Sequence, residues 1–262
     1  MGRLLGLLRR GELAIALMAD RVAGDRRRAS SLRAAHRYWS APGDDDAWQS
    51  NSHWRTGLAD DLWQDVGRQH LDMYRVFAAG LGRTGGPGVT IEWGCGGGAN
   101  AASFAPLASR FIAADISADS VAECLTQVRA VCDTPVQGIH IDIADAVAAS
   151  DGLEGSCDTF LCYYVIELTA APKDALDILA IAERVLTSGG IAVVQVKYHT
   201  AQLGTRGRGG RGYRRHLAQT TTFAIDEFWE HAAASGLIPR LVTLVPRNEL
   251  DSRYAYYALT KP

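Results

Sequence analysis

From residue 86 onward, hydrophobic and polar positions follow two alternating periods. Short β-branched or apolar runs predict strands, and stretches with an apolar residue every three or four positions predict helices. The predicted strands are 89–93, 110–114, 136–141, 159–163, 191–197, 240–245 and 254–260. The predicted helices are 99–108, 118–130, 172–187 and 225–235. Strands and helices that alternate at this spacing are typical of an α/β fold with a doubly wound parallel sheet.

The last two predicted strands are joined only by residues 246–251. This connection is too short for a helical crossover, so we expect the last strand of a seven-stranded sheet to be antiparallel. Residues 1–85 are helical in character, with an apolar set at helical spacing over 62–81. We expect residues 1–85 to form an N-terminal helical cap that binds substrate, and residues 86–262 to form the main domain.

The sequence Glu92-Trp93-Gly94-Cys95-Gly96-Gly97-Gly98 follows the first predicted strand and precedes a helix. A strand, a glycine-rich turn and a helix form a nucleotide pocket in open α/β sheets. The spacing Gly94-x-Gly96-x-x-Ala99 also fits a dinucleotide turn, which presents a pyrophosphate to a helix N-terminus. Glu92 favours another ligand, because a carboxylate two residues before the first glycine repels a pyrophosphate and attracts a cation.

These residues resemble motif I of the class I S-adenosylmethionine-dependent methyltransferases, which have a Rossmann-like seven-stranded sheet. The resemblance implies S-adenosylmethionine as the cofactor. It implies that Gly94, Gly96 and Gly98 line the methionine and ribose part of the cofactor. It further implies that Glu92 faces the amino-acid end and that Asp115, after the second strand, accepts the ribose hydroxyls.

The same resemblance, which covers about residues 86–262, places the adenine. Ile116 is expected to pack on the ring, and Asp142, at the end of the third strand, to accept from its amine. Ile143 is expected to cover the ring, and Asp145 is the alternative to Asp142. The competing interpretation is that Asp115 and Asp142 are surface carboxylates that follow their strands and bind no ligand.

The fourth strand and its continuation, residues 158–168, resemble motif IV of the same family. Many small-molecule members have a histidine near the substrate at the position that Leu168 occupies here. Tyr163 is expected to contact the cationic sulfur or to hold the substrate, with packing in the core as the alternative. Glu167 can position a substrate hydroxyl or, equally well, cap the next helix.

Two histidines are the remaining candidates for a general base. His53 lies in a polar and aromatic segment, residues 49–55, of the kind that forms sugar pockets. His199 follows the fifth predicted strand at its carboxyl end, the side on which α/β sheets bind ligands. The catalytic residues are thus expected among His53, His199, Tyr163 and Glu167; for each histidine the alternative is a structural or surface role.

The segment 204–216 contains five arginines among glycines. We favour a substrate lid that closes over the active site. A solvated loop with no role and a short RNA-binding tract are the alternatives.

Composition narrows the class of protein. The 262 residues are 47% hydrophobic and carry a formal net charge of −2, which argues against a dedicated nucleic-acid binder. Five cysteines without a CxxC pair predict neither disulfides nor zinc, so a reducing cytoplasm is expected. No metal is expected, and no apolar run is long enough to span a membrane. Apolar residues over 4–17 predict a helix that packs on the domain, on a second subunit of a homodimer or on a membrane surface.

We therefore expect an O-methyltransferase that acts on a small molecule, such as a sugar or an oligosaccharide. The layout is similar to that of actinobacterial, especially mycobacterial, sugar O-methyltransferases of the methylmannose polysaccharide type. Three alternatives stay open: N- or C-methylation of another metabolite, RNA methylation using the arginine-rich loop, and a binding or assembly module that retains the fold.

Overall fold

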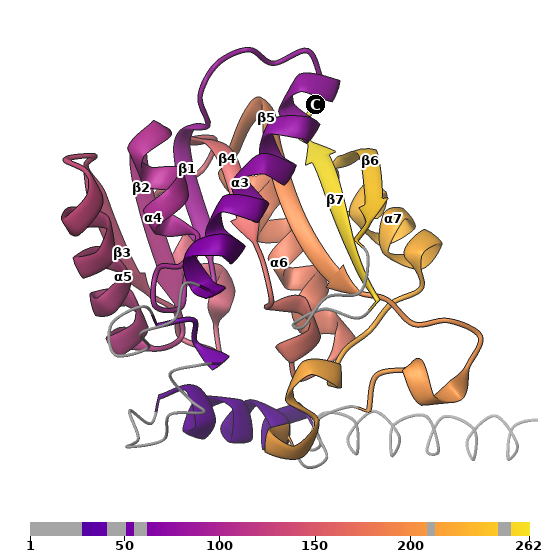
Figure 1. Ribbon diagram of the computed structural model, residues 1–262. Helices are drawn as coiled ribbons and strands as arrows, with labels where there is room; N and C mark the ends of the chain where they lie inside the picture. Colours follow the sequence, from indigo (N-terminus) through magenta and orange to yellow (C-terminus); the bar gives the residue numbers. More distant parts are fainter. Residues whose placement is uncertain (1–27, 41–50, 55–61, 209–212, 246–252) are drawn as a thin grey trace, which may run out of the picture.

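The computed structural model describes residues 28–40, 51–54, 62–208, 213–245 and 253–262. Figure 1 shows one open sheet with helices on both of its faces. The helix expected near the N-terminus, the middle of the arginine-rich loop and the connection before the last strand lie outside the described residues.

Seven strands form a single sheet in the order β3-β2-β1-β4-β5-β7-β6. Their bounds are β1 Gly88–Trp93, β2 Ala108–Asp115, β3 Val136–His140, β4 Cys157–Cys162, β5 Leu186–Lys197, β6 Ile238–Leu244 and β7 Tyr254–Thr260. β1 to β5 pair in parallel, whereas β7 runs antiparallel to both β5 and β6. The predicted doubly wound sheet with an antiparallel last strand is confirmed.

Apart from the helix expected over 99–108, the predicted helices lie where the periodicity places them. Their bounds are α3 Leu62–Gly80, α4 Ala101–Phe104, α5 Ala118–Val131, α6 Pro172–Val185 and α7 Ile225–Ala234, with a further helix over residues 28–39. Short 3₁₀ turns are η1 Ala105–Leu107, η2 Ala146–Ser150, η3 Ile166–Leu168, η4 Leu203–Thr205 and η5 Tyr213–Gln219. Among the described residues, no helix is both long and apolar enough to cross a membrane.

Helix α4 is shorter than predicted. The expected helix over 99–108 is divided into α4 and the 3₁₀ turn η1, which has a proline in its first turn. Proline lacks a backbone N–H, so Pro106 cannot donate the next hydrogen bond of the α-helix, and α4 ends before it. The sequence pattern located the element, and Pro106 set its end.

Each face of the sheet buries its own hydrophobic layer. Helices α3, α4 and α5 cover one face, where Phe77 of α3 packs with Phe104 and Phe111. Helices α6 and α7 cover the other face, where Ile178 and Phe228 lie in one cluster with the strands. Although α3 lies within the expected N-terminal cap, it is therefore one of the layers that bury the sheet.

The helix over 28–39 lies elsewhere. In Figure 1 it runs together with η5 across the carboxyl ends of the parallel strands. Its buried residues Ala35 and Trp39 pack with Tyr213 of η5. Two segments far apart in sequence thus cover the edge of the sheet where α/β folds bind ligands.

Candidate functional site

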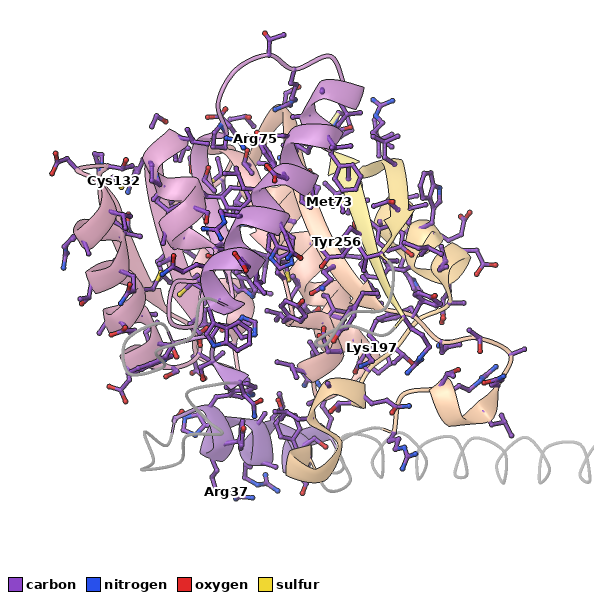
Figure 2. All side chains as sticks on the ribbon, viewed as in Figure 1. Arg37, Met73, Arg75, Cys132, Lys197 and Tyr256 are labelled. Atoms are coloured by element: carbon purple, nitrogen blue, oxygen red, sulfur yellow. The ribbon has the colours of Figure 1, made fainter. Side chains whose placement is uncertain are left out.

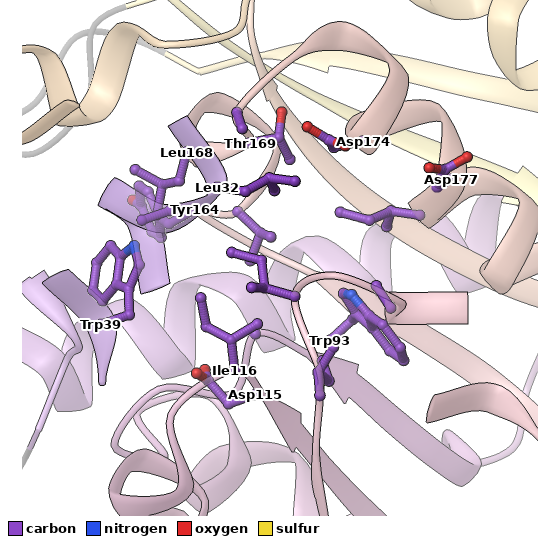
Figure 3. A pocket seen from close by; sticks show the side chains of 18 of the residues that line it. Leu32, Trp39, Trp93, Asp115, Ile116, Tyr164, Leu168, Thr169, Asp174 and Asp177 are labelled. Atoms are coloured by element: carbon purple, nitrogen blue, oxygen red, sulfur yellow. The ribbon is translucent and has the colours of Figure 1, made fainter. Parts of the chain in front are cut away.

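A cavity of about 400 Å³ lies between the carboxyl ends of β1, β2 and β4 and the helix over 28–39. Around it, Figure 3 shows Trp93 at the end of β1, Asp115 at the end of β2 with Ile116 directly after it, Trp39 of the helix over 28–39, and Tyr164 after β4. Sites for small molecules usually measure about 300–1,000 Å³. The cavity therefore suits one or two small ligands.

The glycine turn after β1 forms one wall of this cavity. Gly94 has φ +81°, and a Cβ there would lie 2.2 Å from Cγ2 of Val165. Gly96 has φ +50°, and its Cβ would lie 2.3 Å from the carbonyl oxygen of Ser52. Both glycines line the cavity, whereas Gly98 faces α5, where its Cβ would lie 3.0 Å from Cα of Cys124. Only the first two glycines are therefore placed to approach a ligand.

The backbone N–H groups of this turn are already used inside the protein. The N–H groups of Gly94 and Cys95 both donate to the carbonyl of Ala114. The Gly96 N–H donates to an Asp115 carboxylate oxygen. The Gly97 N–H donates to the Ser52 carbonyl, and the Gly98 N–H donates to the Cys95 carbonyl. A dinucleotide turn needs such groups free for pyrophosphate. This pattern favours a ligand without a pyrophosphate.

Asp115 ends β2 and lines the cavity. Its Oδ2 accepts from the N–H of Gly96 and its Oδ1 from the N–H of Ser117, each at 2.9 Å. Burial raises the pKa of this carboxyl, and the backbone donors oppose that shift. Each carboxylate oxygen can accept a further bond, so the side chain is fixed in place and can still receive two ligand hydroxyls.

Glu92 is buried directly behind the cavity-lining residues Trp93 and Gly94. Its Oε1 accepts from Nδ2 of Asn100 at 2.7 Å, while its buried Oε2 has no hydrogen-bond partner among the described residues. Burial raises the pKa of Glu92 to about 8. A cationic ligand group would supply the missing partner and favour the ionised carboxylate.

The predicted adenine end is placed only in part. Ile116 and Ile143 line the cavity and pack against the helix over 28–39. Asp142, however, is exposed, does not line the cavity, and accepts from the N–H of Ala144 at 2.8 Å. Asp145 lines the cavity instead. The structure thus favours Asp145, because the local turn takes up the side chain of Asp142.

Two consecutive tyrosines follow β4 and line the cavity. Tyr163 is buried, its hydroxyl has no hydrogen-bond partner among the described residues, and its ring stacks on His70 at 4.1 Å. Burial raises the pKa of the Tyr163 hydroxyl, so it stays protonated. Tyr164 has φ +57°, an unfavourable conformation for a bulky residue, and its N–H donates to Oε1 of Gln195 at 2.7 Å. Strain of this kind often marks a functional site.

Glu167 does not reach the cavity. Its side chain is buried, and its Oε1 accepts from the hydroxyl of Tyr254 at 2.7 Å. Glu167 is not among the residues that line the cavity, because the chain turns into η3 there and this carboxylate lies in the interior.

Of the two candidate histidines, one lines the cavity. His53 has φ +55°, stacks on Trp63 at 4.1 Å between ring centroids and meets Tyr164 edge-on at 5.1 Å. Burial, and then the nearby His70, lower the pKa of His53 to about 3, so the ring is neutral. His199 lies outside the cavity, with Nδ1 3.2 Å from Oγ1 of Thr222. The structure therefore does not support His199 as a base.

The N-terminal segment 51–54 closes the cofactor side. The Ser52 carbonyl accepts from the N–H of Gly97 at 2.7 Å, and a Cβ on Gly97 would lie 2.4 Å from Cα of Trp54. From the arginine-rich loop, Tyr213 lines the cavity, whereas the exposed Arg206 and Arg208 do not.

A polar end of the cavity was not identified from the sequence. Arg28 donates from Nε to Oδ1 of Asp174 at 2.7 Å, and both residues line the cavity. Oδ2 of Asp174 is buried without a hydrogen-bond partner among the described residues. Figure 3 shows Asp174 and Asp177 on the same helix, α6, opposite Asp115. In the part of the chain that the structure describes, no three His, Cys, Asp or Glu residues converge as a metal site.

His70 was also missed, although the sequence carried a signal for it. It occupies the buried face of α3 at helical spacing between Val66 and Tyr74. A histidine at a position where core residues are expected needs buried hydrogen-bond partners. Those partners lie on other elements of the fold, and the pattern within one helix does not show them.

Comparisons with known proteins agree with this geometry. Residues 91–194 match a family model described as a methyltransferase domain. No curated protein sequence matches the chain. The chain carries a methyltransferase domain. S-adenosylmethionine is its cofactor, and the enzyme class is that of the S-adenosylmethionine-dependent methyltransferases.

Solved structures show the same fold. Magnesium protoporphyrin IX methyltransferase from Synechocystis PCC 6803 with bound SAH is 15% identical, with a TM-score of 0.61 over 87% of this chain and 98% of that one. The 1,6-didemethyltoxoflavin-N1-methyltransferase of Burkholderia thailandensis is 20% identical, with a TM-score of 0.56 over 79% and 81%. The cyclase SpnF is 16% identical, with a TM-score of 0.54 over 80% and 85%. Such similarity shows the fold and leaves the acceptor open.

Proposed function

We propose that this methyltransferase transfers the methyl group of S-adenosylmethionine to a hydroxyl oxygen of a small acceptor, a sugar or an oligosaccharide. One observation carries the cofactor assignment. The N–H groups of the glycine turn are all used inside the protein, while a buried Glu92 oxygen directly behind the turn has no hydrogen-bond partner in the part of the chain that the structure describes. The zwitterionic end of S-adenosylmethionine matches this arrangement, and a dinucleotide does not.

The residues of the site fit the parts of the cofactor. Gly94 and Gly96 leave room beside the backbone, Asp115 would take the ribose hydroxyls, and Glu92 would face the ammonium group. Ile116 and Ile143, with Asp145 nearby, would enclose the adenine. When bound, the cofactor supplies an electrophilic methyl group on a sulfonium. The protein has to align the acceptor oxygen, exclude water and receive a proton.

Several features support a small hydroxylated acceptor. The cavity combines the aromatic rings of Trp39 and Tyr164 with polar groups of Asn51, Ser52 and Asp174. Aromatic surfaces with a few fixed polar groups suit polyols. The described arginines of the loop do not line the cavity, which speaks against RNA as the acceptor. Five free cysteines support a cytoplasmic location.

His53 is the group we assign to the acceptor hydroxyl. Its neutral ring can accept a hydrogen bond from an alcohol, because a depressed pKa leaves it unprotonated at all physiological pH values. An oxygen that gains a methyl group becomes strongly acidic, so even this weakly basic ring can receive its proton. Alignment then contributes more to the rate than basicity does.

The test has two steps. Calorimetry with S-adenosylhomocysteine and with NAD should show binding of the first alone. Turnover with methyl-labelled S-adenosylmethionine is then measured on mono- and oligosaccharides and on matched amino sugars, in which an amine replaces one hydroxyl. Label on the hydroxylated acceptors supports O-methylation. Label only on the amino sugars would replace it by N-methylation, and binding of NAD alone would contradict the whole assignment.

A further inference from the structure

A continuous chain of hydrogen bonds, most of them buried, runs through the protein next to the cavity. It begins at the Tyr164 N–H, which donates to Oε1 of Gln195 at 2.7 Å, and Nε2 of Gln195 donates to the Tyr256 hydroxyl at 2.7 Å. That hydroxyl lies 3.0 Å from Nε2 of His70. Nδ1 of His70 lies 2.8 Å from Oδ1 of Asn100, whose Nδ2 donates to Glu92 at 2.7 Å. We call these side chains, from Gln195 to Glu92, the relay.

The five residues of the relay come from five different places in the fold. His70 lies on α3, Glu92 on β1, and Asn100 just before α4. Gln195 and Tyr256 lie on the paired strands β5 and β7. Figure 2 places Tyr256 beside α3. All five side chains are at most 4% exposed, so water does not compete for these bonds.

The direction of every bond in the relay is fixed. Asn100 must donate to the carboxylate of Glu92, so its carbonyl oxygen accepts from His70. The pKa of His70 is lowered to about 4 by burial, so its ring is neutral and carries one proton, on Nδ1. Nε2 is then an acceptor, and the Tyr256 hydroxyl donates to it. Each donor therefore points towards Glu92, and bonds aligned in this way polarise one another.

Each end of the relay lies next to residues that line the cavity, namely Trp93 and Gly94 beside Glu92, and Tyr164 beside Gln195. At one end, the second oxygen of Glu92, behind the glycine turn, has no hydrogen-bond partner within the described ranges. At the other end, Tyr164 lines the cavity in a left-handed conformation and contacts His53. We propose that His70, Tyr256 and Gln195 are positioning residues that link the carboxylate facing the cofactor ammonium to the tyrosine of the acceptor side.

This inference rests on the proposed cofactor placement and predicts a consequence of its own. Donors aligned towards Glu92 stabilise its ionised form, which is the form that a cationic ammonium group needs. Cutting the relay at Tyr256 should therefore weaken ligands that carry this ammonium group. It should not weaken ligands that lack it.

The test uses Tyr256→Phe in the full chain, with Tyr74→Phe as the matched control. Tyr74 is also a buried tyrosine of this layer, but its hydroxyl lies 3.4 Å from Oγ1 of Thr159, outside the relay. Calorimetry compares S-adenosylhomocysteine, which has the ammonium group, with methylthioadenosine, which has the same nucleoside and no amino acid. Tyr256→Phe should weaken S-adenosylhomocysteine about 5- to 30-fold, the effect of one or two lost buried interactions. Methylthioadenosine affinity should not change, and Tyr74→Phe should change neither.

Hydrogen exchange provides the second readout, at the other end of the relay. S-adenosylhomocysteine should slow exchange of the Tyr164 N–H in the wild type and in Tyr74→Phe, and not in Tyr256→Phe. Equal weakening of both ligands by Tyr256→Phe, or unchanged exchange at Tyr164 in the wild type, would overturn the linkage. A wild-type protein that binds neither ligand would instead contradict the proposed function.

Discussion

The indole Nε1 of Trp39 donates a 2.8 Å hydrogen bond to the hydroxyl of Tyr213, 174 residues further along the chain. That hydroxyl in turn donates to the Leu168 carbonyl at 2.9 Å. Three segments that cover the cavity therefore meet at one phenol group. Because Ile116 and Ile143 pack in the same cluster, this contact lies over the predicted adenine position.

Removing the Tyr213 hydroxyl should weaken the contact between the three segments that cover the cavity. Tyr213→Phe should raise the dissociation rate of S-adenosylhomocysteine several-fold, because two buried hydrogen bonds of about 1 kcal/mol each are lost from the closed form. Stopped-flow measurement of the dissociation rate checks this. The control is Tyr257→Phe, whose hydroxyl donates to the Ile225 carbonyl away from the cavity. Equal dissociation rates in the two variants would show that the contact does not hold the cover closed.

The glycine turn provides a second test. Gly94→Ala should reduce stability and abolish cofactor binding, since its Cβ would lie 2.2 Å from Val165 in addition to the strain of φ +81°. Gly152→Ala is the control, because Gly152 has φ +78° with nothing within 4 Å of a Cβ. Left-handed alanine alone costs about 1–2 kcal/mol. Thermal unfolding should show this loss of stability in both variants. Calorimetry should show a defect in cofactor binding only in Gly94→Ala.

Asp115→Ala should weaken S-adenosylhomocysteine by about 1–3 kcal/mol, through lost charge-assisted bonds to the ligand and loss of the bond that holds Gly96. The control is Asp158→Ala, which removes a carboxylate that accepts from the Val89 N–H at the opposite end of β1. Isothermal calorimetry distinguishes the two. Similar affinities in both variants would remove Asp115 from the cofactor site.

The two histidines should differ in turnover. His53→Ala should lower turnover by roughly 10²–10⁴-fold if it receives the proton, while His199→Ala should stay near wild type because its ring lies outside the cavity. Turnover is measured at saturating cofactor across pH 6–8. No inflection near pH 6.5 is expected, because the pKa of His53 is about 3. A near-normal rate in His53→Ala would leave alignment by Tyr164 as the main contribution.

Glu92 should make the cofactor-free protein less stable as the pH rises. Its pKa is about 8 when folded and 4.5 as the reference value, so between these values the folded state holds a proton that the unfolded state releases. Stability is therefore lost as the pH rises through this window, with a slope of about 1.4 kcal/mol per pH unit. Urea unfolding from pH 6.5 to 8 should show this slope in the wild type and a flatter profile in Glu92→Gln. Parallel profiles would mean that Glu92 is ionised throughout.

The sheet was predictable because each strand and helix carries its own periodicity. The buried run 89–93 and the helical spacing of 172–185 are local patterns that need no partner to be read. Glycine spacing and Asp115 likewise identified the cofactor edge, since both features lie within single turns of the chain. The ends of elements were harder to predict than their positions, because the end of α4 depends on the single residue Pro106 within a longer helical pattern.

The rest of the site depends on contacts between distant segments. Asp142 and Asp145 are equivalent in sequence, and only the turn that takes up Asp142 separates them. His199 follows a strand at the correct edge, yet the loop after β5 directs it to Thr222. The role of His70 could not be predicted, because its hydrogen-bond partners Asn100 and Tyr256 lie 30 and 186 residues away in the sequence.

The bond from the Gly97 N–H to the Ser52 carbonyl also sets an order of assembly. During synthesis the segment 51–54 leaves the ribosome before the glycine turn exists. The segment 51–54 cannot make this bond before β1 and the glycine turn have been synthesised. The turn itself needs β2, because its N–H groups donate to the Ala114 carbonyl and to Asp115. This wall of the cofactor pocket can therefore close only after β2 has been translated, although the segment 51–54 precedes β2 in the sequence.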